Sequence, residues 1–194
     1  GSPTPGPGET SFMNIVDGGR SFVYVVDVSS SMSEGQRLEL AKSQLKGSLH
    51  RLQPSQKFQV LFYNETTVQM RLRRRPADDL YTATAVQLQL ADDEIDRVQP
   101  SGGTEHRTPL LHALRLEPEV VYFLTDGDQP ELSTQGKDSD LAQLGRANRS
   151  GARIHVIEFG SGGRESRHVS WLELLAHRFG GRYQYIHVGS RRQN

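Results

Sequence analysis

The sequence predicts an α/β fold: a doubly wound, mostly parallel sheet with one antiparallel edge strand and helices on both faces. Two observations predict it. Apolar runs rich in β-branched and aromatic residues, such as Phe22–Val26 and Val120–Leu124, are typical of buried strands. Amphipathic segments with helical periodicity separate these runs, and strands that alternate with helices favour a parallel sheet covered on both sides.

Taken in chain order, the apolar runs predict six strands, of which the third follows the second through a short Asn64-Glu65 turn. A turn of that length favours an antiparallel hairpin at an edge of the sheet. The other strands are expected to be parallel. The predicted strands are Phe22–Val26, Phe58–Tyr63, Thr66–Met70, Val120–Leu124, Arg153–Phe159 and Arg182–Val188.

Helices are predicted between these strands from apolar residues that recur on one face. Pro54 ends the first helix, Thr108 and Pro109 suit the cap and first position of the third, and Gly180-Gly181 stops the last. The predicted helices are Gln36–Leu52, Asp78–Gln99, Thr108–Leu116, Asp138–Arg149 and Ser166–Phe179.

A chain of 194 residues is long enough for one domain with a substantial core. The first residues are rich in Gly, Pro and Ser and begin without Met, so we expect residues 1–11 to be a flexible linker or a remnant of expression. Residues 12–190 are then a single domain and residues 191–194 a tail. This organisation suggests a domain taken from a longer protein.

Composition excludes several function classes. The 23 basic residues balance 23 acidic ones, which gives no general attraction to nucleic acid. The basic stretch Arg71–Pro76 has no interleaved aromatic residues and is interpreted as a solvated segment. The absence of cysteine excludes disulfides and thiolate chemistry, and no apolar stretch reaches the length of a membrane span.

A carboxylate and hydroxyls stand where the first strand ends. Asp27, Ser29 and Ser31 alternate directly after Phe22–Val26, at the edge where open α/β sheets bind ligands. Such hard oxygen ligands suit Mg²⁺, Mn²⁺ or Ca²⁺. The alternative is purely structural: Ser31 or Ser33 would cap a helix beginning near Gly35.

Two later segments favour the metal site. Gly102-Gly103-Thr104 allows the backbone to approach a ligand and adds a hydroxyl, and Thr125-Asp126 follows another buried strand. Asp128 is interpreted as a turn residue. Helix capping alone does not explain two acidic strand ends together with a glycine-rich loop.

With these residues the chain resembles the von Willebrand factor A (vWA) domain family, in particular its compact bacterial modules, from about Arg20 to Val188. The family's metal-ion-dependent adhesion site (MIDAS) consists of Asp-x-Ser-x-Ser, a distant Thr and a distant Asp. The resemblance implies a Rossmann-like fold and a divalent cation, Mg²⁺ first, with Mn²⁺ and Ca²⁺ as alternatives. It assigns the metal ligands to Asp27, Ser29, Ser31, Thr104 and Asp126.

The resemblance further implies a module for protein interaction, in adhesion or assembly, and not an enzyme. An Asp or Glu from a protein partner would occupy an open position on the cation. We expect a monomeric domain that neither binds nucleic acid nor inserts into a membrane. The parent protein could be membrane-anchored or exposed at a cell surface.

An enzymatic alternative is a Mg²⁺-dependent phosphatase of the haloacid-dehalogenase type, with Asp27 as the nucleophile. That chemistry needs an acid two residues later, where this chain has Ser29, a poor general acid. Of the scattered histidines, His155 is interpreted as a packed core residue and His106 as a surface loop residue.

Overall fold

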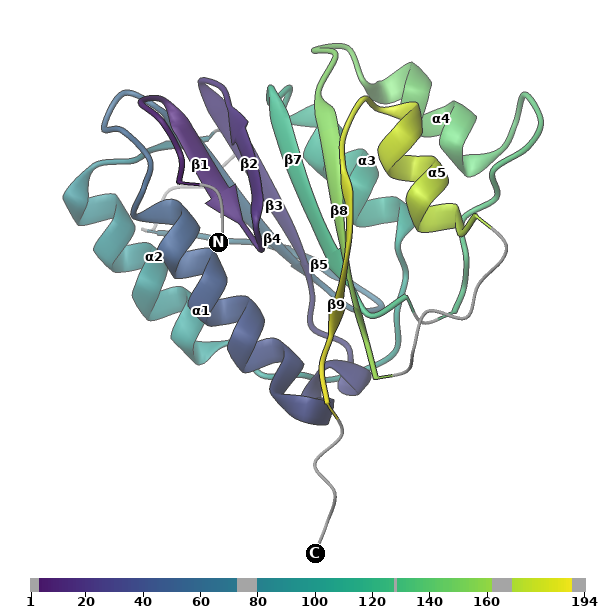
Figure 1. Ribbon diagram of the computed structural model, residues 1–194, viewed down its shortest axis with the longest axis horizontal. Helices are drawn as coiled ribbons and strands as arrows, with labels where there is room; N and C mark the ends of the chain where they lie inside the picture. Colours follow the sequence, from purple (N-terminus) through teal and green to yellow (C-terminus); the bar gives the residue numbers. More distant parts are fainter. Residues whose placement is uncertain (1–3, 73–79, 128, 162–168, 190–194) are drawn as a thin grey trace, which may run out of the picture.

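A computed structural model shows a central sheet between two layers of helices (Figure 1). It describes residues 4–72, 80–127, 129–161 and 169–189. The predicted fold class is confirmed: the sheet is mostly parallel, and helices cover both of its faces.

The main sheet has the strand order β5-β4-β3-β7-β8-β9, with β6 also paired to β4. β3, β4, β7, β8 and β9 are parallel neighbours, whereas β5 and β6 both run antiparallel to β4. The predicted edge hairpin is therefore present. The strands are β3 (Ser21–Asp27), β4 (Lys57–Tyr63), β5 (Thr67–Gln69), β6 (Tyr81–Thr82), β7 (Val120–Thr125), β8 (Arg153–Gly160) and β9 (Tyr183–His187).

In the described part of the chain, five α-helices connect the strands; four of them are shorter than their sequence patterns predicted, whereas α3 has the predicted length and lies one residue earlier. They are α1 (Arg37–Leu49), α2 (Ala85–Arg97), α3 (Arg107–Arg115), α4 (Asp140–Ala147) and α5 (Trp171–Arg178). The second prediction is corrected most, because Tyr81–Thr82 pairs with β4 as strand β6 and the side chain of Thr84 caps α2. Similarly, Ser139 and Ser170 cap α4 and α5 and fix later starts than predicted.

The alternation of side chains along β3 divides the interior into two cores. Phe22, Tyr24 and Val26 face one side, where they pack with apolar residues of α1 and α2. Val23 and Val25 face the other side, with residues of α3, α4 and α5. Because successive strand residues point to opposite faces, a central strand buried on both sides needs a continuous apolar run.

A hairpin before the main sheet was not predicted. β1 (Glu9–Phe12) and β2 (Ile15–Gly18) pair antiparallel, and the turn residues Met13 and Asn14 both have positive φ, 50° and 67°. Such two-residue turns match the twist of paired strands. Residues 9–11, expected to belong to a linker, are therefore part of the folded structure.

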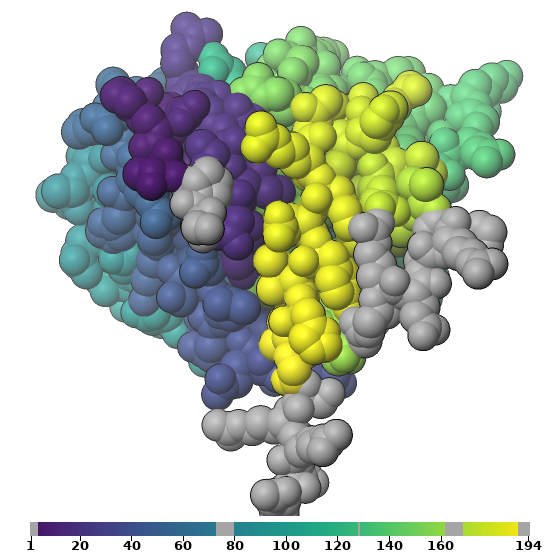
Figure 2. All heavy atoms as spheres, viewed as in Figure 1, coloured from purple at the N-terminus to yellow at the C-terminus, as the bar shows by residue number. Residues whose placement is uncertain are grey.

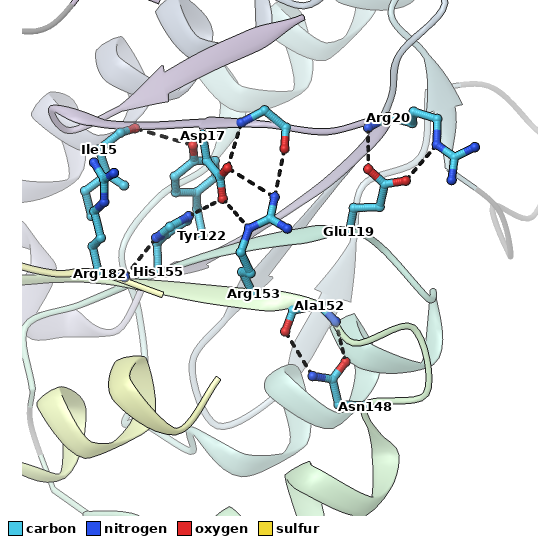
Figure 3. Close-up of polar contacts among 11 residues, drawn as sticks. Ile15, Asp17, Arg20, Glu119, Tyr122, Asn148, Ala152, Arg153, His155 and Arg182 are labelled. Atoms are coloured by element: carbon cyan, nitrogen blue, oxygen red, sulfur yellow. Dashed lines mark hydrogen bonds and ion pairs between the residues drawn. The ribbon is translucent and has the colours of Figure 1, made fainter. Parts of the chain in front are cut away.

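Polar contacts attach this hairpin to the main sheet (Figure 3). Arg153 on β8 donates two hydrogen bonds to the carboxylate of Asp17, at 2.7 and 3.1 Å, and a third to the carbonyl of Gly18. His155, two residues further along β8, also contacts Asp17. The hairpin is thereby fixed near the amino ends of the parallel strands, opposite their carboxyl ends.

Strand β9 forms the edge of the sheet opposite β5. Its residues are only partly buried, and the strand is visible along the surface in the space-filling view (Figure 2, yellow). None of the helices in the described part of the chain combines the length and the apolarity that crossing a membrane requires.

Candidate functional site at the carboxyl edge of the sheet

Three segments meet where the parallel strands end, at the lower edge of the sheet in Figure 1. The first follows β3 and continues into a 3₁₀ segment, η1 (Ser30–Gln36). The second is the Ser101–Thr104 loop: the N–H of Ser30 donates to the carbonyl of Gly102 at 3.0 Å, and the N–H of Ser101 donates to Val28 at 2.8 Å. The third follows β7. These segments carry all five predicted ligands.

Asp27 is completely buried at the end of β3. Its Oδ1 accepts the N–H of Ser29 at 2.9 Å, and its Oδ2 accepts the hydroxyl of Thr125 at 2.9 Å. Burial raises the pKa of the Asp27 carboxyl above its ordinary value; the bonds from Ser29 and Thr125 oppose the rise, and the negative charge of Asp126 adds to it. Two acidic groups therefore influence each other at this edge.

The two predicted serine ligands lie together. The Oγ atoms of Ser29 and Ser31 are 3.1 Å apart, and Ser29 is buried. Neither Ser31 nor Ser33 caps the following helix: α1 begins after Gln36, without a side-chain cap, and the hydroxyl of Ser33 donates to the carbonyl of Ser30. The capping explanation for these hydroxyls is therefore wrong.

The two oxygens of the Asp126 carboxylate have different surroundings. Its side chain is only 1% exposed, and Oδ2 accepts a hydrogen bond from Nη1 of Arg37 at 3.2 Å. Oδ1 is buried without a hydrogen-bond partner among the residues that the structure describes. A buried carboxylate oxygen ordinarily has a donor, so this atom indicates a missing partner.

Thr104 lies on the loop that contacts Ser30 and is half-buried. The loop is fixed from its other side, because Gly103 donates its N–H to the carboxylate of Glu65 at 2.9 Å, and Glu105 donates its N–H to the carbonyl of Asn64. Beside it, Val28, Tyr63, Asn64 and Ser101 are among the residues lining a pocket of 220 Å³. None of the five candidate ligands is among the residues that line this pocket.

The interpretation of His106 as a surface residue is wrong. His106 is fully buried, its Nδ1 lies 3.0 Å from the hydroxyl of Tyr63, and its ring contacts that of Trp171. The helix α3 also starts earlier than predicted from Thr108. The carboxylate of Glu105 accepts the N–H groups of Arg107 and Thr108, which fixes the first turn of the helix.

Sequence reasoning missed three residues that surround the predicted ligands. Arg37 binds Asp126; Thr125 donates to Asp27; the hydroxyl of Tyr63 lies 3.4 Å from the same carboxylate. A strand pattern alone gives no reason to separate Tyr63 and Thr125 from their apolar neighbours. Asp128, interpreted as a turn residue, lies outside the described residues.

The donor set fits a divalent cation of the hard type. Two carboxylates and the hydroxyls of Ser29, Ser31 and Thr104 are oxygen donors, and Oδ1 of Asp126 is unpartnered. Across the described residues, no group of three or more His, Cys, Asp or Glu side chains could hold a metal ion. A site here would therefore depend on its hydroxyl ligands.

Comparison with known proteins assigns the fold to a family. A family model described as von Willebrand factor type A domain matches residues 21–185. The chain belongs to this family. The vWA domain is 32% identical over 122 residues to inter-alpha-trypsin inhibitor heavy chain H2 of Homo sapiens, a match that covers 56% of this chain and 12% of that protein. The chain thus spans a small part of that relative's length.

Solved structures show the same fold. A von Willebrand factor type A protein from Catenulispora acidiphila has a TM-score of 0.67 at 19% identity, covering 86% of this chain and 38% of that one. The pilus adhesin SpaC from Lactobacillus rhamnosus GG has a TM-score of 0.61 at 14% identity, covering 88% and 30%. Proximal thread matrix protein 1 of the mussel byssus, with a zinc-occupied MIDAS motif, has a TM-score of 0.54 at 19% identity, covering 85% and 41%.

These matches include mammalian and bacterial proteins, so the likeness does not single out the bacterial modules expected from the sequence. The family assignment gives no support to the phosphatase alternative.

Proposed function

We propose that this vWA domain is a metal-dependent protein-binding module for adhesion or assembly, acting by binding and not by catalysis. Asp27, Ser29, Ser31, Thr104 and Asp126 would hold a divalent cation, Mg²⁺ in the first place, with Mn²⁺ and Ca²⁺ as alternatives. The bound cation would supply a positively charged position open to an Asp or Glu of a protein partner.

The observation that carries the proposal is the direct contact between the ligand-bearing segments. Ser30 donates to Gly102 on one side, and Arg37 joins the carbonyl of Ser31 to the carboxylate of Asp126 on the other, each contact to Arg37 measuring 3.2 Å. The segments are therefore held together before any ligand arrives, which reduces the conformational entropy lost on binding.

Similar proteins support this proposal. One similar solved structure, proximal thread matrix protein 1, has a zinc-occupied MIDAS motif, and another is a pilus adhesin. We infer that this domain likewise binds a cation and a protein, as a monomer within a parent protein that is anchored to a membrane or exposed at a surface.

Titration with Mg²⁺ and with Mn²⁺ by calorimetry tests the proposal. Wild type should bind either cation saturably, whereas Asp27→Ala should not bind, with circular dichroism showing that both are folded. Asp93→Ala is the matched control, because Asp93 is an exposed aspartate on α2 and is not one of the five candidate ligands. Unchanged affinity in Asp27→Ala would contradict the assignment of the site.

A further inference from the structure

Arg37 lies at this edge but is not one of the five candidate ligands, so its role there needs a separate explanation. The residue is buried, with only 7% of its surface exposed. Its Nη1 atom lies 3.2 Å from both Oδ2 of Asp126 and the carbonyl oxygen of Ser31, and its Nε atom is buried without a hydrogen-bond partner among the described residues. A buried guanidinium needs a compensating charge, and Asp126 supplies it.

The backbone before Arg37 is shaped to return this side chain to the edge. Gly35 and Gln36 both have left-handed φ values, 56° and 61°, so the chain turns sharply between η1 and α1. Left-handed φ is unfavourable for a non-glycine residue such as Gln36. Because the turn places Arg37 against Ser31 and Asp126, its strain is compensated at the candidate site.

The formal charges define what Arg37 does there. Asp27 and Asp126 contribute two negative charges and Arg37 one positive charge, which leaves one net negative charge. Glu34 is 3.6 Å from Arg37, but its side chain is 70% exposed and largely screened by water. A divalent cation would change the net charge of the cluster to plus one. Without Arg37, the same cation would give a neutral cluster.

We propose that Arg37 is a built-in counter-cation that limits the affinity of the site for free metal ions and leaves the loaded site positively charged. Arg37 is also a positioning residue: it binds Oδ2 of Asp126, which leaves Oδ1, the unpartnered oxygen, as the atom that would bind a cation. This inference rests on the proposed function. It explains how occupancy of the site would depend on an acidic partner, which the remaining positive charge attracts.

Charge removal at Arg37 tests the inference by metal affinity. Arg37→Met removes the charge but retains an unbranched side chain, and it should bind Mn²⁺ about tenfold more tightly than wild type, since a unit positive charge no longer repels the cation. Arg37→Lys keeps the charge and should remain within about threefold of wild type. In the metal-free state, Arg37→Met should have a lower midpoint of thermal unfolding than wild type, because two carboxylates lose their counter-ion.

Each combination of results has a separate meaning. If wild type binds Mn²⁺ and Arg37→Met binds it with the same or lower affinity, the role of Arg37 is overturned while the metal site is upheld. Equal tightening in Arg37→Lys and Arg37→Met would also overturn that role, because charge would not be the operative property. If only Arg37→Met binds Mn²⁺, the inference is upheld. The proposal that the wild-type domain binds a metal ion without a partner is then contradicted. Absence of binding in all variants would overturn both proposals.

Discussion

The Nε2 atom of His155 lies 2.7 Å from Oδ2 of Asp17, although the two residues are 138 positions apart in the sequence. The tautomer of the neutral ring follows from its second contact: Nδ1 accepts the N–H of Arg182 at 2.9 Å, so Nε2 carries the proton and donates it to Asp17 (Figure 3). A carboxylate on the amino-terminal hairpin is thus bound by side chains of the central sheet.

Replacement of Asp17 by Asn should lower the free energy of unfolding by about 2 to 3 kcal/mol, because charge-assisted bonds to Arg153 and His155 are lost. Urea denaturation measures the loss. Glu119→Gln is the matched control, since Glu119 pairs with an Arg20 side chain that is 92% exposed, and its loss should stay below about 1 kcal/mol. Equal losses in the two variants would argue against a role of Asp17 in fixing the hairpin.

Acidification should destabilise the domain in a window set by His155. Burial lowers the pKa of His155 below 6.5, and the hydrogen bond that His155 donates to Asp17 only partly opposes this. The unfolded chain then binds more protons than the folded one, so stability is complete above about pH 6.5 and falls as pH decreases towards the folded-state pKa. His112 contributes in the same direction, because burial lowers its pKa as well.

Urea denaturation at pH 7.5 and pH 5.5 measures this effect. In His155→Gln, the difference in unfolding free energy between the two pH values should be smaller than in wild type, leaving the part due to His112. If His155→Gln loses as much unfolding free energy between pH 7.5 and 5.5 as wild type does, the assignment of this pH dependence to His155 is contradicted.

A second loss of unfolding free energy should follow below pH 3.8. Burial alone would raise the pKa of Asp17, but hydrogen bonds from Arg153 and His155 hold it below that value.

Donors to Asp27 should affect both stability and metal binding. Thr125→Val removes a buried hydroxyl that donates to Asp27 at 2.9 Å, and it should lower the unfolding free energy by about 1 to 3 kcal/mol. Tyr63→Phe removes a hydroxyl that lies 3.4 Å from the same carboxylate. Because this contact is longer, the change in Mn²⁺ affinity should be smaller in Tyr63→Phe than in Thr125→Val. Calorimetry compares the affinities; the reverse order would show that the Tyr63 hydroxyl is the more important donor.

Two glycine substitutions should have opposite effects on stability. A Cβ at Gly181 would lie 1.8 Å from the carbonyl oxygen of Ile154, so Gly181→Ala should unfold the domain or destabilise it by more than about 3 kcal/mol. A Cβ at Gly47, inside α1, meets no atom closer than 4.0 Å, so Gly47→Ala should stabilise the domain by about 0.5 to 1 kcal/mol. Thermal unfolding of the two variants measures both changes.

The parts of the fold that the sequence predicted correctly depend on local patterns. A buried parallel strand such as Phe22–Val26 has a continuous apolar run, and the order of such runs is sufficient to predict the alternation of strands and helices. The hairpin was missed because its turn consists of Met13 and Asn14, without the glycine that usually marks positive φ. Similarly, the helix predicted from Asp78 gave no sign that Tyr81 pairs with Phe58.

The candidate ligands were named from spacing and from the resemblance to a family, but their surroundings were not. Thr125 and Tyr63 look like ordinary strand residues, and Arg37 looks like the first turn of an amphipathic helix. Their roles arise only when segments distant in the sequence come into contact. A buried ion pair such as Arg37–Asp126 has no signature in local sequence, because its two members are 89 residues apart.

Strand β3 is paired residue by residue on both sides, Val26 with Phe62 on β4 and with Leu124 on β7. Inserting one residue into β3 would exchange the side chains that enter the two cores and turn Asp27 away from Thr125. Chain length at the centre of this domain is therefore fixed to the single residue. Insertions and deletions should be tolerated in the connecting loops, so the domain can acquire a new surface around the carboxyl edge without losing the alignment of Asp27 with Asp126.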